Sequence, residues 1–139
     1  MIIPNLLVTD VPACVAFYRD VLGFEVSMVI DGDRQMMSGG DYRGGVFALL
    51  TWQGGELMLQ DADNFRDEMA DVIDRDQIPM PAATVYLRGF NPDPVLPRLP
   101  DGHLVKGPFL QWYGMREVYL RDPEGHMVVL GHAEGPPPA

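Results

Sequence analysis

One order of structural elements occurs twice in this sequence, and the repeat limits the possible folds more than any other feature. In each half, a strand-like run is followed by a helix or a proline-rich stretch, and then by three more strand-like runs. The strand-like runs lie at 2–9, 24–30, 46–53 and 56–60, and again at 83–89, 103–109, 111–120 and 126–132. Two modules of about 60–70 residues are too small to be independent domains, so we expect them to share one core. The predicted fold class is α+β.

The predicted boundaries follow from this repeat. A single domain covers 1–133, with module one at 1–60 and module two at 82–133. Between them lies an acidic connector at 61–81, in which we expect one short helix. The tail at 134–139 is rich in proline and glycine, and we expect it to be disordered.

The first helix has clear start and stop signals. Asp10 is a typical N-cap residue. Pro12, two positions after it, suits the first helical turn. Gly23 is a typical C-terminal stop. Between these signals, apolar residues recur at three- and four-residue spacing and predict one buried stripe, formed by Cys14, Val15, Phe17, Tyr18, Val21 and Leu22. The corresponding stretch of module two, 91–102, contains four prolines and is predicted to form one helical turn at most.

A hairpin is predicted at Gly54-Gly55, where two glycines separate two strand-like runs. A two-residue loop there pairs Gln53 with Glu56. Alternation then divides the two strands into a polar and an apolar face. We expect the polar face to line a wet cavity and the apolar face to pack on the helix; the first holds Leu49, Thr51, Gln53, Glu56, Met58 and Gln60, and the second Leu50, Trp52, Leu57 and Leu59.

The charge and composition of the chain limit the classes of partner that it can bind. Twenty acidic residues against ten basic ones give a net charge of −10, which repels nucleic acid and anionic lipid, so we expect neither as a partner. The same negative charge attracts cations. No apolar run is long enough to span a membrane, and we expect no signal peptide. The single cysteine, Cys14, fits a reducing compartment, so the predicted location is the cytoplasm.

Two stretches resemble the vicinal oxygen chelate superfamily, which includes glyoxalase I, bleomycin resistance proteins and extradiol dioxygenases. These are LLVTDVPACVAFYRDVLGFEV near the N-terminus and MREVYLRDPEGHMVVLGH near the C-terminus. The resemblance covers 1–133 and implies two βαββ modules that form an open, cupped mixed sheet around a ligand cavity. It also implies a homodimer.

Metal-dependent members of that superfamily place one metal ligand on each of four strands. The matching positions here are Asn5, Glu56, Thr84 and Val129. Only one of the four is a carboxylate, whereas a catalytic divalent ion generally needs about three strong protein ligands. The prediction is therefore that the protein has no metal ligand and no cofactor, as in the metal-free bleomycin resistance proteins.

The polar strand faces supply the candidate ligand-binding residues. In module two, Tyr86 shares the face of Thr84, and Glu117 and Tyr119 lie opposite the apolar Val118 and Leu120. An aromatic and carboxylate-lined cup suits a flat or cationic organic molecule. The predicted ligand-binding set is Asn5, Gln53, Glu56, Met58, Gln60, Thr84, Tyr86, Trp112, Glu117 and Tyr119. An alternative for module two is that its tyrosines only pack and that Glu117 pairs with Arg88 or Arg121.

The predicted function is non-catalytic binding of a small organic molecule, and the acidic charge favours a cationic, antibiotic-like one. Three alternatives stay open. The first is a metal-independent isomerase or lyase that uses Glu56 as its base. The second is a metal-dependent glyoxalase or dioxygenase with a non-standard site. The third is a protein-interaction domain with a vestigial cavity.

Overall fold

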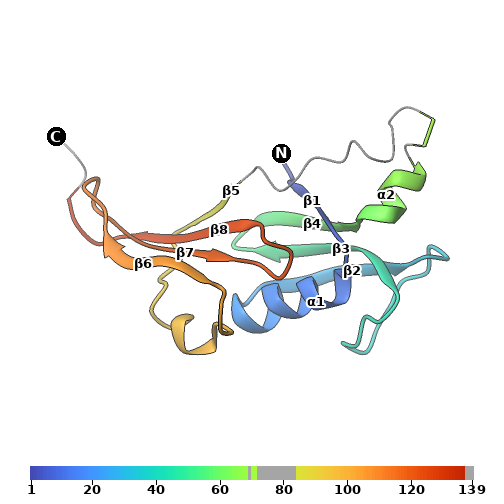
Figure 1. Cartoon of the computed structure of the whole chain (residues 1–139), viewed down its shortest axis with the longest axis horizontal. Coiled ribbons are helices and arrows are strands. Elements are labelled where there is room, and N and C mark those ends of the chain that lie inside the picture. Colours follow the sequence, from blue (N-terminus) through green and yellow to red (C-terminus); the bar gives the residue numbers. More distant parts are fainter. Residues whose placement is uncertain (69, 72–83, 137–139) are drawn as a thin grey trace. The chain divides into compact units, whose positions relative to one another are not determined.

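The computed structural model describes residues 1–68, 70–71 and 84–136, and the chain divides into two compact units (Figure 1). Unit 1 is Met1–Pro79 and unit 2 is Met80–Ala139. Each unit holds one four-stranded sheet in which one strand pair is parallel and two are antiparallel. The predicted α+β fold class is therefore confirmed.

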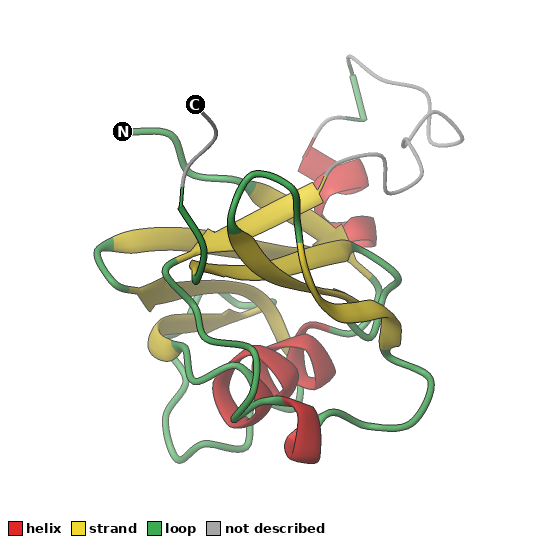
Figure 2. Cartoon of the chain, turned by 90° about the vertical axis from the view of Figure 1, so that its left-hand side faces the viewer, coloured by secondary structure: helices red, strands yellow, loops and turns green. Residues whose placement is uncertain are grey.

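Unit 1 has a helix packed on one face of its sheet. The sheet order is β1-β4-β3-β2, with β1 parallel to β4. The helix α1 packs against β3 and β4, and the views of Figures 1 and 2 place it under the strands. The elements of unit 1 are β1 (Asn5–Val8), α1 (Val11–Ala16), a π-helical turn η1 (Phe17–Val21), β2 (Glu25–Asp31), β3 (Gly45–Trp52), β4 (Gly55–Asp61) and α2 (Ala62–Glu68).

The predicted limits and buried stripe of the first helix are confirmed. The Asp10 carboxylate accepts a hydrogen bond from the Ala13 backbone N–H at 3.0 Å, as an N-cap should. Gly23 ends the helical segment with φ of 79°, a conformation that favours glycine. All six residues of the predicted stripe are buried. Their side chains join the core that covers the apolar face of β3 and β4.

The hairpin loop between β3 and β4 differs from the prediction by one residue. Its two loop residues are Gln53 and Gly54, both with positive φ, at 47° and 78°. Gly55 is the first residue of β4, and Glu56 pairs with Thr51 rather than with Gln53. A type I′ turn needs left-handed backbone at both positions, and it takes glycine readily at the second. Since the partners shift by two positions, the residues that remain in the two strands keep their predicted faces, whereas Gln53 lies in the turn instead of on the polar face.

Unit 2 repeats the sheet with β5 (Thr84–Arg88), β6 (Leu104–Leu110), β7 (Met115–Arg121) and β8 (Met127–Ala133), in the order β5-β8-β7-β6. The predicted single helical turn is confirmed as the 3-10 helix η3 (Leu96–Arg98). The strand predicted at 111–120 begins later than expected. Trp112 and Tyr113 lie in the turn between β6 and β7, which is closed by a hydrogen bond from Gly114 N–H to Gln111 O at 2.9 Å.

The C-terminal tail is tied to that same turn. The carbonyl oxygen of Gly114 accepts hydrogen bonds from the backbone N–H groups of Glu134 and Gly135, both at 2.9 Å. The turn thus supplies a hydrogen-bond acceptor for the first two residues of the tail, and disorder of the tail stays an expectation. Residues 137–139 lie outside the described residues, as does the connector from 72 onward. The predicted connector helix is present as α2 over 62–68.

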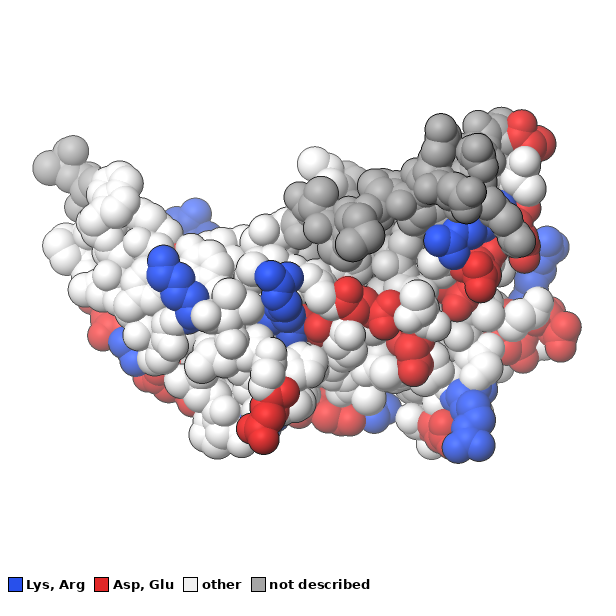
Figure 3. Space-filling model, viewed as in Figure 1, with Lys and Arg blue, Asp and Glu red and all other residues white. Residues whose placement is uncertain are grey.

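No helix among the described residues has the length and apolar character needed to cross a membrane. The charge of the chain is unevenly divided between the units. Residues 1–79 carry 14 acidic and 5 basic side chains, whereas residues 80–139 carry 6 and 5. The space-filling view shows mixed clusters of acidic and basic groups over unit 1, and larger uncharged areas over unit 2 (Figure 3). The acidity predicted from composition is thus mainly a property of unit 1.

Candidate functional site: a caged carboxylate in unit 2

The most unusual polar residue of the described chain is Glu117, at the centre of β7. Its side chain is completely buried, although a carboxylate is among the groups least often found inside a protein. The alternation of side chains along a strand explains which way the Glu117 side chain points. Val118 and Leu120 point into the apolar core, so Glu117 points to the opposite, polar face of the sheet.

Four side chains donate hydrogen bonds to this carboxylate. The hydroxyl of Tyr86 donates to Oε1 at 2.6 Å, and that of Tyr119 donates to Oε2 at 3.0 Å. The hydroxyl of Tyr113 lies 2.8 Å from both oxygens, and the amide of Gln111 lies 3.2 Å from Oε2. We call these five residues the Glu117 cage. It corrects the alternative in which Glu117 pairs with Arg88 or Arg121, since its partners are three tyrosines and Gln111.

The cage draws on three separate parts of unit 2. Tyr86 comes from β5, Glu117 and Tyr119 come from β7, and Gln111 and Tyr113 come from the turn that precedes β7. Tyr119 is held from the side by the ring of Phe109 on β6, with centroids 6.0 Å apart and planes 7° apart. The cage therefore ties the turn and both outer parts of the sheet to the central strand.

Gly131 on β8 makes room for the hydrogen bond between Tyr86 and Glu117. The strand β8 lies between β5 and β7, and Gly131 pairs with Glu117 across the sheet. A Cβ atom at Gly131 would overlap the Tyr86 hydroxyl, and it would lie 2.9 Å from Cζ of the same ring. A side chain on this central strand would therefore displace Tyr86 from the carboxylate.

The hydrogen bonds decide the ionisation of the cage. Burial by itself raises the pKa of Glu117, but the three tyrosine hydroxyls and the Gln111 amide outweigh it and hold this pKa below its ordinary value. In turn, burial and the hydrogen bond to Glu117 raise the pKa of both Tyr86 and Tyr113. At neutral pH the cage therefore holds an ionised Glu117 beside the neutral phenols of Tyr86 and Tyr113.

A hollow of about 590 Å³ opens beside the cage. Cage residues line part of it, and the remaining wall is mostly apolar or backbone, with one basic side chain, Arg88. This volume lies within the range of about 300–1,000 Å³ typical of small-molecule sites. Its lining includes Tyr86, Arg88, Tyr113, Met115 and Glu117.

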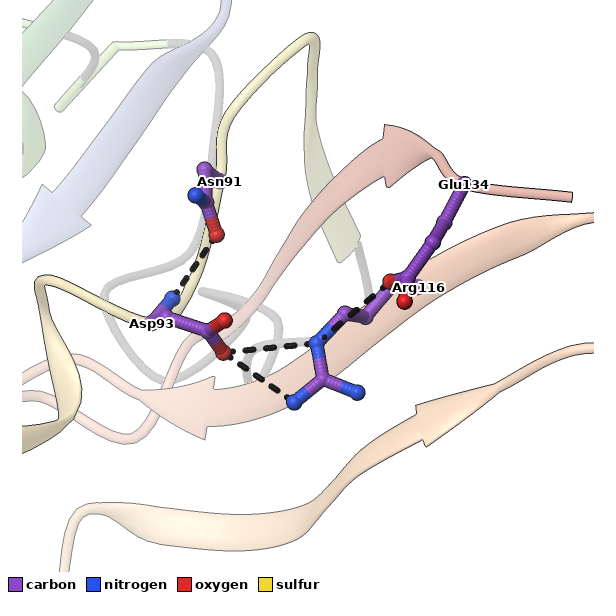
Figure 4. Close-up of polar contacts among 4 residues, drawn as sticks. All are labelled: Asn91, Asp93, Arg116 and Glu134. Carbon is purple, nitrogen blue, oxygen red and sulfur yellow. Dashed lines mark hydrogen bonds and ion pairs between the residues drawn. The ribbon is translucent and has the colours of Figure 1, made fainter.

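The opposite face of β7 is held by an ion-pair network around Arg116 (Figure 4). Its guanidinium donates to Asp93 Oδ1 at 3.1 and 3.3 Å and lies 3.6 Å from Glu134 Oε2. The Asp93 backbone N–H also donates to Asn91 Oδ1 at 3.1 Å. Because Arg116 directly precedes Glu117, these contacts hold the strand segment that carries the buried carboxylate.

The predicted site residues of module one form a different group, all in unit 1. The Asn5 amide donates to Gln60 Oε1 at 2.9 Å, and the Gln60 amide donates to Asn64 and Glu68 at 2.9 and 3.1 Å. Gln60 is buried, and it borders a second hollow, of about 560 Å³. Asn5 and Gln60 are thus brought together by the pairing of β1 with β4.

The other three predicted residues of module one have separate surroundings. Met58 pairs with Leu49 on β3 and with Asn5 on β1, and is half-buried. Glu56 is half-buried on the same face, and Gln53 is exposed in the hairpin turn. Neither residue lines the second hollow. The idea of a site centred on Glu56 stays a prediction.

Within unit 2 the predicted residues separate into members and non-members of the cage. Tyr86, Glu117 and Tyr119 belong to it. Thr84 is exposed at the start of β5, and Trp112 is 81% exposed and does not line the hollow. Sequence reasoning missed Gln111 and Tyr113, and it placed both at the start of a strand rather than in a turn. The run QWYG was the available signal, since glycine after polar and aromatic residues is typical of a turn.

The four positions at which the superfamily binds metal do not fit a metal ion here. Their side chains are an amide, a carboxylate, a hydroxyl and a hydrocarbon, and the Asn5 amide already donates to Gln60. Among the described residues, no group of three His, Cys, Asp or Glu side chains could hold a metal ion. We therefore derive no chemistry through a metal.

Comparison with known proteins identifies the fold. Residues 2–40 match the family model "Bleomycin resistance protein-like N-terminal". A glyoxalase/bleomycin resistance protein/dioxygenase family enzyme from Burkholderia phytofirmans PsJN superposes with a TM-score of 0.65 at 18% identity, over 94% of this chain and 96% of that one. The chain has the vicinal oxygen chelate fold. The fold expected from the sequence is thereby confirmed.

Two further structures with this fold illustrate its range. A glyoxalase-related enzyme from Fulvimarina pelagi gives a TM-score of 0.68 at 14% identity, over 100% of this chain and 96% of that one. The antibiotic binding protein TnmS3 from Streptomyces sp. CB03234 gives 0.62 at 19% identity, over 95% and 93%. No curated protein matches the sequence. Enzymes and binding proteins thus share the vicinal oxygen chelate fold, so the function must be argued from the site.

Proposed function

We propose that this vicinal oxygen chelate protein binds a small organic molecule non-covalently, without metal or cofactor, in the hollow beside the Glu117 cage. The observation that carries the proposal is a hollow of ligand size next to a buried, fully hydrogen-bonded carboxylate. Aromatic side chains give such a site a large contact area, and a few fixed polar groups orient the ligand.

The state of Glu117 favours binding over acid–base catalysis. A general base needs an accessible lone pair and a pKa near the working pH. Glu117 accepts hydrogen bonds on both oxygens, and its pKa lies below the ordinary value. It is therefore a weak base without a free acceptor position. Its suitable role is to fix the tyrosines and to supply one negative charge.

The comparisons are consistent with this role. The N-terminal segment matches a bleomycin-resistance-like model, and one protein of the same fold is described as antibiotic binding. The catalytic alternative, with Glu56 as base, rests on unit 1 and concerns a different residue. A cytoplasmic location remains part of the proposal.

The experiment is a titration of the whole chain with metal-free bleomycin, followed by amide NMR. We expect shifts for the backbone groups of Tyr86, Tyr113 and Met115. The variant Tyr86→Ala should weaken binding at least tenfold, whereas Leu110→Ala, which is exposed and does not line the hollow, should not. A series of neutral and anionic aromatic compounds is titrated in parallel. If no compound shifts the residues of the hollow, the proposed site is wrong.

A further inference from the structure

The proton positions in the cage limit what a ligand can present to it. An ionised carboxylate only accepts hydrogen bonds, and a phenol has a single proton. The Tyr86 hydroxyl lies 2.6 Å from Glu117 Oε1, so its proton is directed at the carboxylate. Its oxygen is left with acceptor positions alone. Because Tyr86 is 42% exposed and lines the hollow, a ligand that reaches this oxygen must bring a hydrogen-bond donor.

Charge selects which donor is favoured. The cage carries the negative charge of Glu117, and no cationic side chain donates a hydrogen bond to this carboxylate among the described residues. A protonated nitrogen at Tyr86 would gain both a hydrogen bond and attraction to the carboxylate beneath. A neutral donor gains only the first. A protonated nitrogen could also lie against the tyrosine ring.

At a second point of the same hollow, Arg88 requires the opposite kind of ligand group, a hydrogen-bond acceptor. It lies two residues after Tyr86 on β5, so both side chains leave the same face, about 6.6 Å apart along the strand. A guanidinium has five donors and no acceptor. Within the residues that the structure describes, no carboxylate forms an ion pair with Arg88, and its side chain is exposed. Arg88 is therefore available for an acidic group of a ligand.

We infer that the ligand of this hollow is a zwitterion, with a protonated nitrogen for Tyr86 above the Glu117 cage and a carboxylate or phosphate for Arg88. This inference rests on the proposed function and adds its ligand class. The two groups are joined by an apolar body, which contacts Met115 and the ring of Tyr113. The separation of Tyr86 and Arg88 along the strand favours a ligand with its two charges at opposite ends of that body. It disfavours a ligand such as a free α-amino acid, whose two charges lie next to one another.

Four compounds built on one benzene ring test the inference. 4-(Aminomethyl)benzoate carries both charges at opposite ends, and its methyl ester keeps only the ammonium group. 4-Methylbenzoate keeps only the carboxylate, and methyl 4-methylbenzoate is neutral. Dissociation constants are measured by amide NMR of the whole chain. We expect the zwitterion to bind at least tenfold tighter than either singly charged compound.

Variants assign each charge to its partner. Arg88→Gln should remove the advantage of the zwitterion over the ammonium ester. Tyr86→Phe should remove its advantage over 4-methylbenzoate, while the conservative variant Arg88→Lys should restore part of the first advantage. Arg121→Gln is the matched control, since Arg121 does not line the hollow.

The outcomes separate this inference from the proposed function. If all four compounds shift the residues of the hollow with equal affinity, the hollow binds organic molecules but the zwitterion inference is wrong. If the ester binds as tightly as the zwitterion, Arg88 has no role in recognition, which also overturns the inference. If none of the four binds there while bleomycin does, the ligand class is wrong and the site stands. If neither does, the site itself is wrong.

Discussion

At the scale of single residues, Glu117 is the position with the most consequence for stability. Replacing it by glutamine leaves one acceptor oxygen and introduces an amide donor among groups that are themselves donors. Hydrogen bonds to a charged group contribute about 1.5–3 kcal/mol each, and unsatisfied buried donors add a penalty. We expect Glu117→Gln to lower the free energy of unfolding by about 2–3 kcal/mol in urea titrations, with the exposed Glu25→Gln as the matched control. Equal stability of the two variants would contradict the cage.

The same residue predicts a dependence of stability on acid. The pKa of Glu117 is lower in the folded than in the unfolded chain, so its stabilisation is complete above the ordinary value of 4.5 and is lost as the pH falls below it. Glu117→Gln removes this contribution. The loss of stability between pH 5 and acid should therefore be shallower in the variant than in the wild type, as measured by thermal melting at a series of pH values.

Tyr86 and Tyr113 predict how the stability of the protein changes at alkaline pH. Burial and the hydrogen bond to Glu117 raise the pKa of Tyr86 and Tyr113 above their ordinary value of 10.0. A raised pKa stabilises the folded chain fully below pH 10, and this contribution is lost as the pH rises further. In absorbance titrations, part of the phenolate signal should appear only as the protein unfolds. Because Tyr18 is buried in unit 1, this late part should become smaller rather than disappear in the double variant Tyr86→Phe, Tyr113→Phe, and an unchanged late part there would refute the assignment.

Alternation and the family resemblance could predict three of the five cage residues. Alternation puts Glu117 and Tyr119 opposite Val118 and Leu120, and the resemblance at Thr84 implies that Tyr86 faces the cavity as well. The cage itself was not predictable, because it needs the exact start of β7. Tyr113 reaches Glu117 only from a turn, and a boundary error of a few residues hides that contact. Gly131 gave no signal either, since a glycine in a strand becomes informative only when its neighbour across the sheet is known.

At the scale of elements, Gly131 on β8 is the residue that permits contact between β5 and β7. Gly131→Ala would place a Cβ atom on the Tyr86 hydroxyl, so Tyr86 must move and its bond to Glu117 is lost. We expect a loss of about 1–3 kcal/mol in unfolding free energy. In the background of Tyr86→Ala the same substitution should cost clearly less, which a double-mutant cycle measures. Additive effects of the two substitutions would show that Gly131 acts on something else.

The hairpin between β3 and β4 gives a prediction of the opposite sign. Gln53 holds a φ of 47°, and asparagine adopts this left-handed conformation more readily than glutamine. Gln53→Asn should therefore raise the free energy of unfolding, by about 0.5 kcal/mol, without changing the face of any side chain. Gln53→Val is the comparison variant and should lower it. Chemical denaturation of all three chains provides the measurement.

Element order and helix limits were predictable because their signals are local. Asp10, Pro12 and Gly23 each act on backbone groups within a turn of themselves, so the sequence contains the whole argument. The register of the hairpin was not predictable, because a Gln-Gly loop and a Gly-Gly loop both suit a two-residue turn. Its faces nevertheless came out correctly, since moving a two-residue loop by one position shifts the partners by two and preserves parity.

At the scale of the whole molecule, the net charge of −10 divides unequally. Residues 1–79 hold 14 of the 20 acidic side chains, while residues 80–139 are almost neutral. The overall acidity therefore says little about the hollow in unit 2, where local groups decide. Screening by salt acts mainly on charges farther apart than the Debye length, about 8–10 Å at physiological ionic strength. Recognition by the cage should consequently depend less on salt than the net charge of the chain would imply.

The last prediction concerns assembly and uses the exposed edge of the unit 2 sheet. The strand β6 is the outer strand of that sheet, and its side chains Leu104, Val105 and Leu110 are 46%, 45% and 56% exposed. These apolar side chains can be buried against a second chain, whereas Lys106 and Pro108 of the same strand oppose pairing through its backbone edge. We therefore expect a homodimer that sediments at twice the chain mass of 15.5 kDa at micromolar concentration. A lysine in place of one of these exposed apolar side chains opposes their burial, so Val105→Lys should shift the protein toward the monomer, whereas Asp101→Lys, in the preceding loop, should not. A wild type that is monomeric would refute the dimer, and a Val105→Lys variant that stays dimeric would place the interface on another surface.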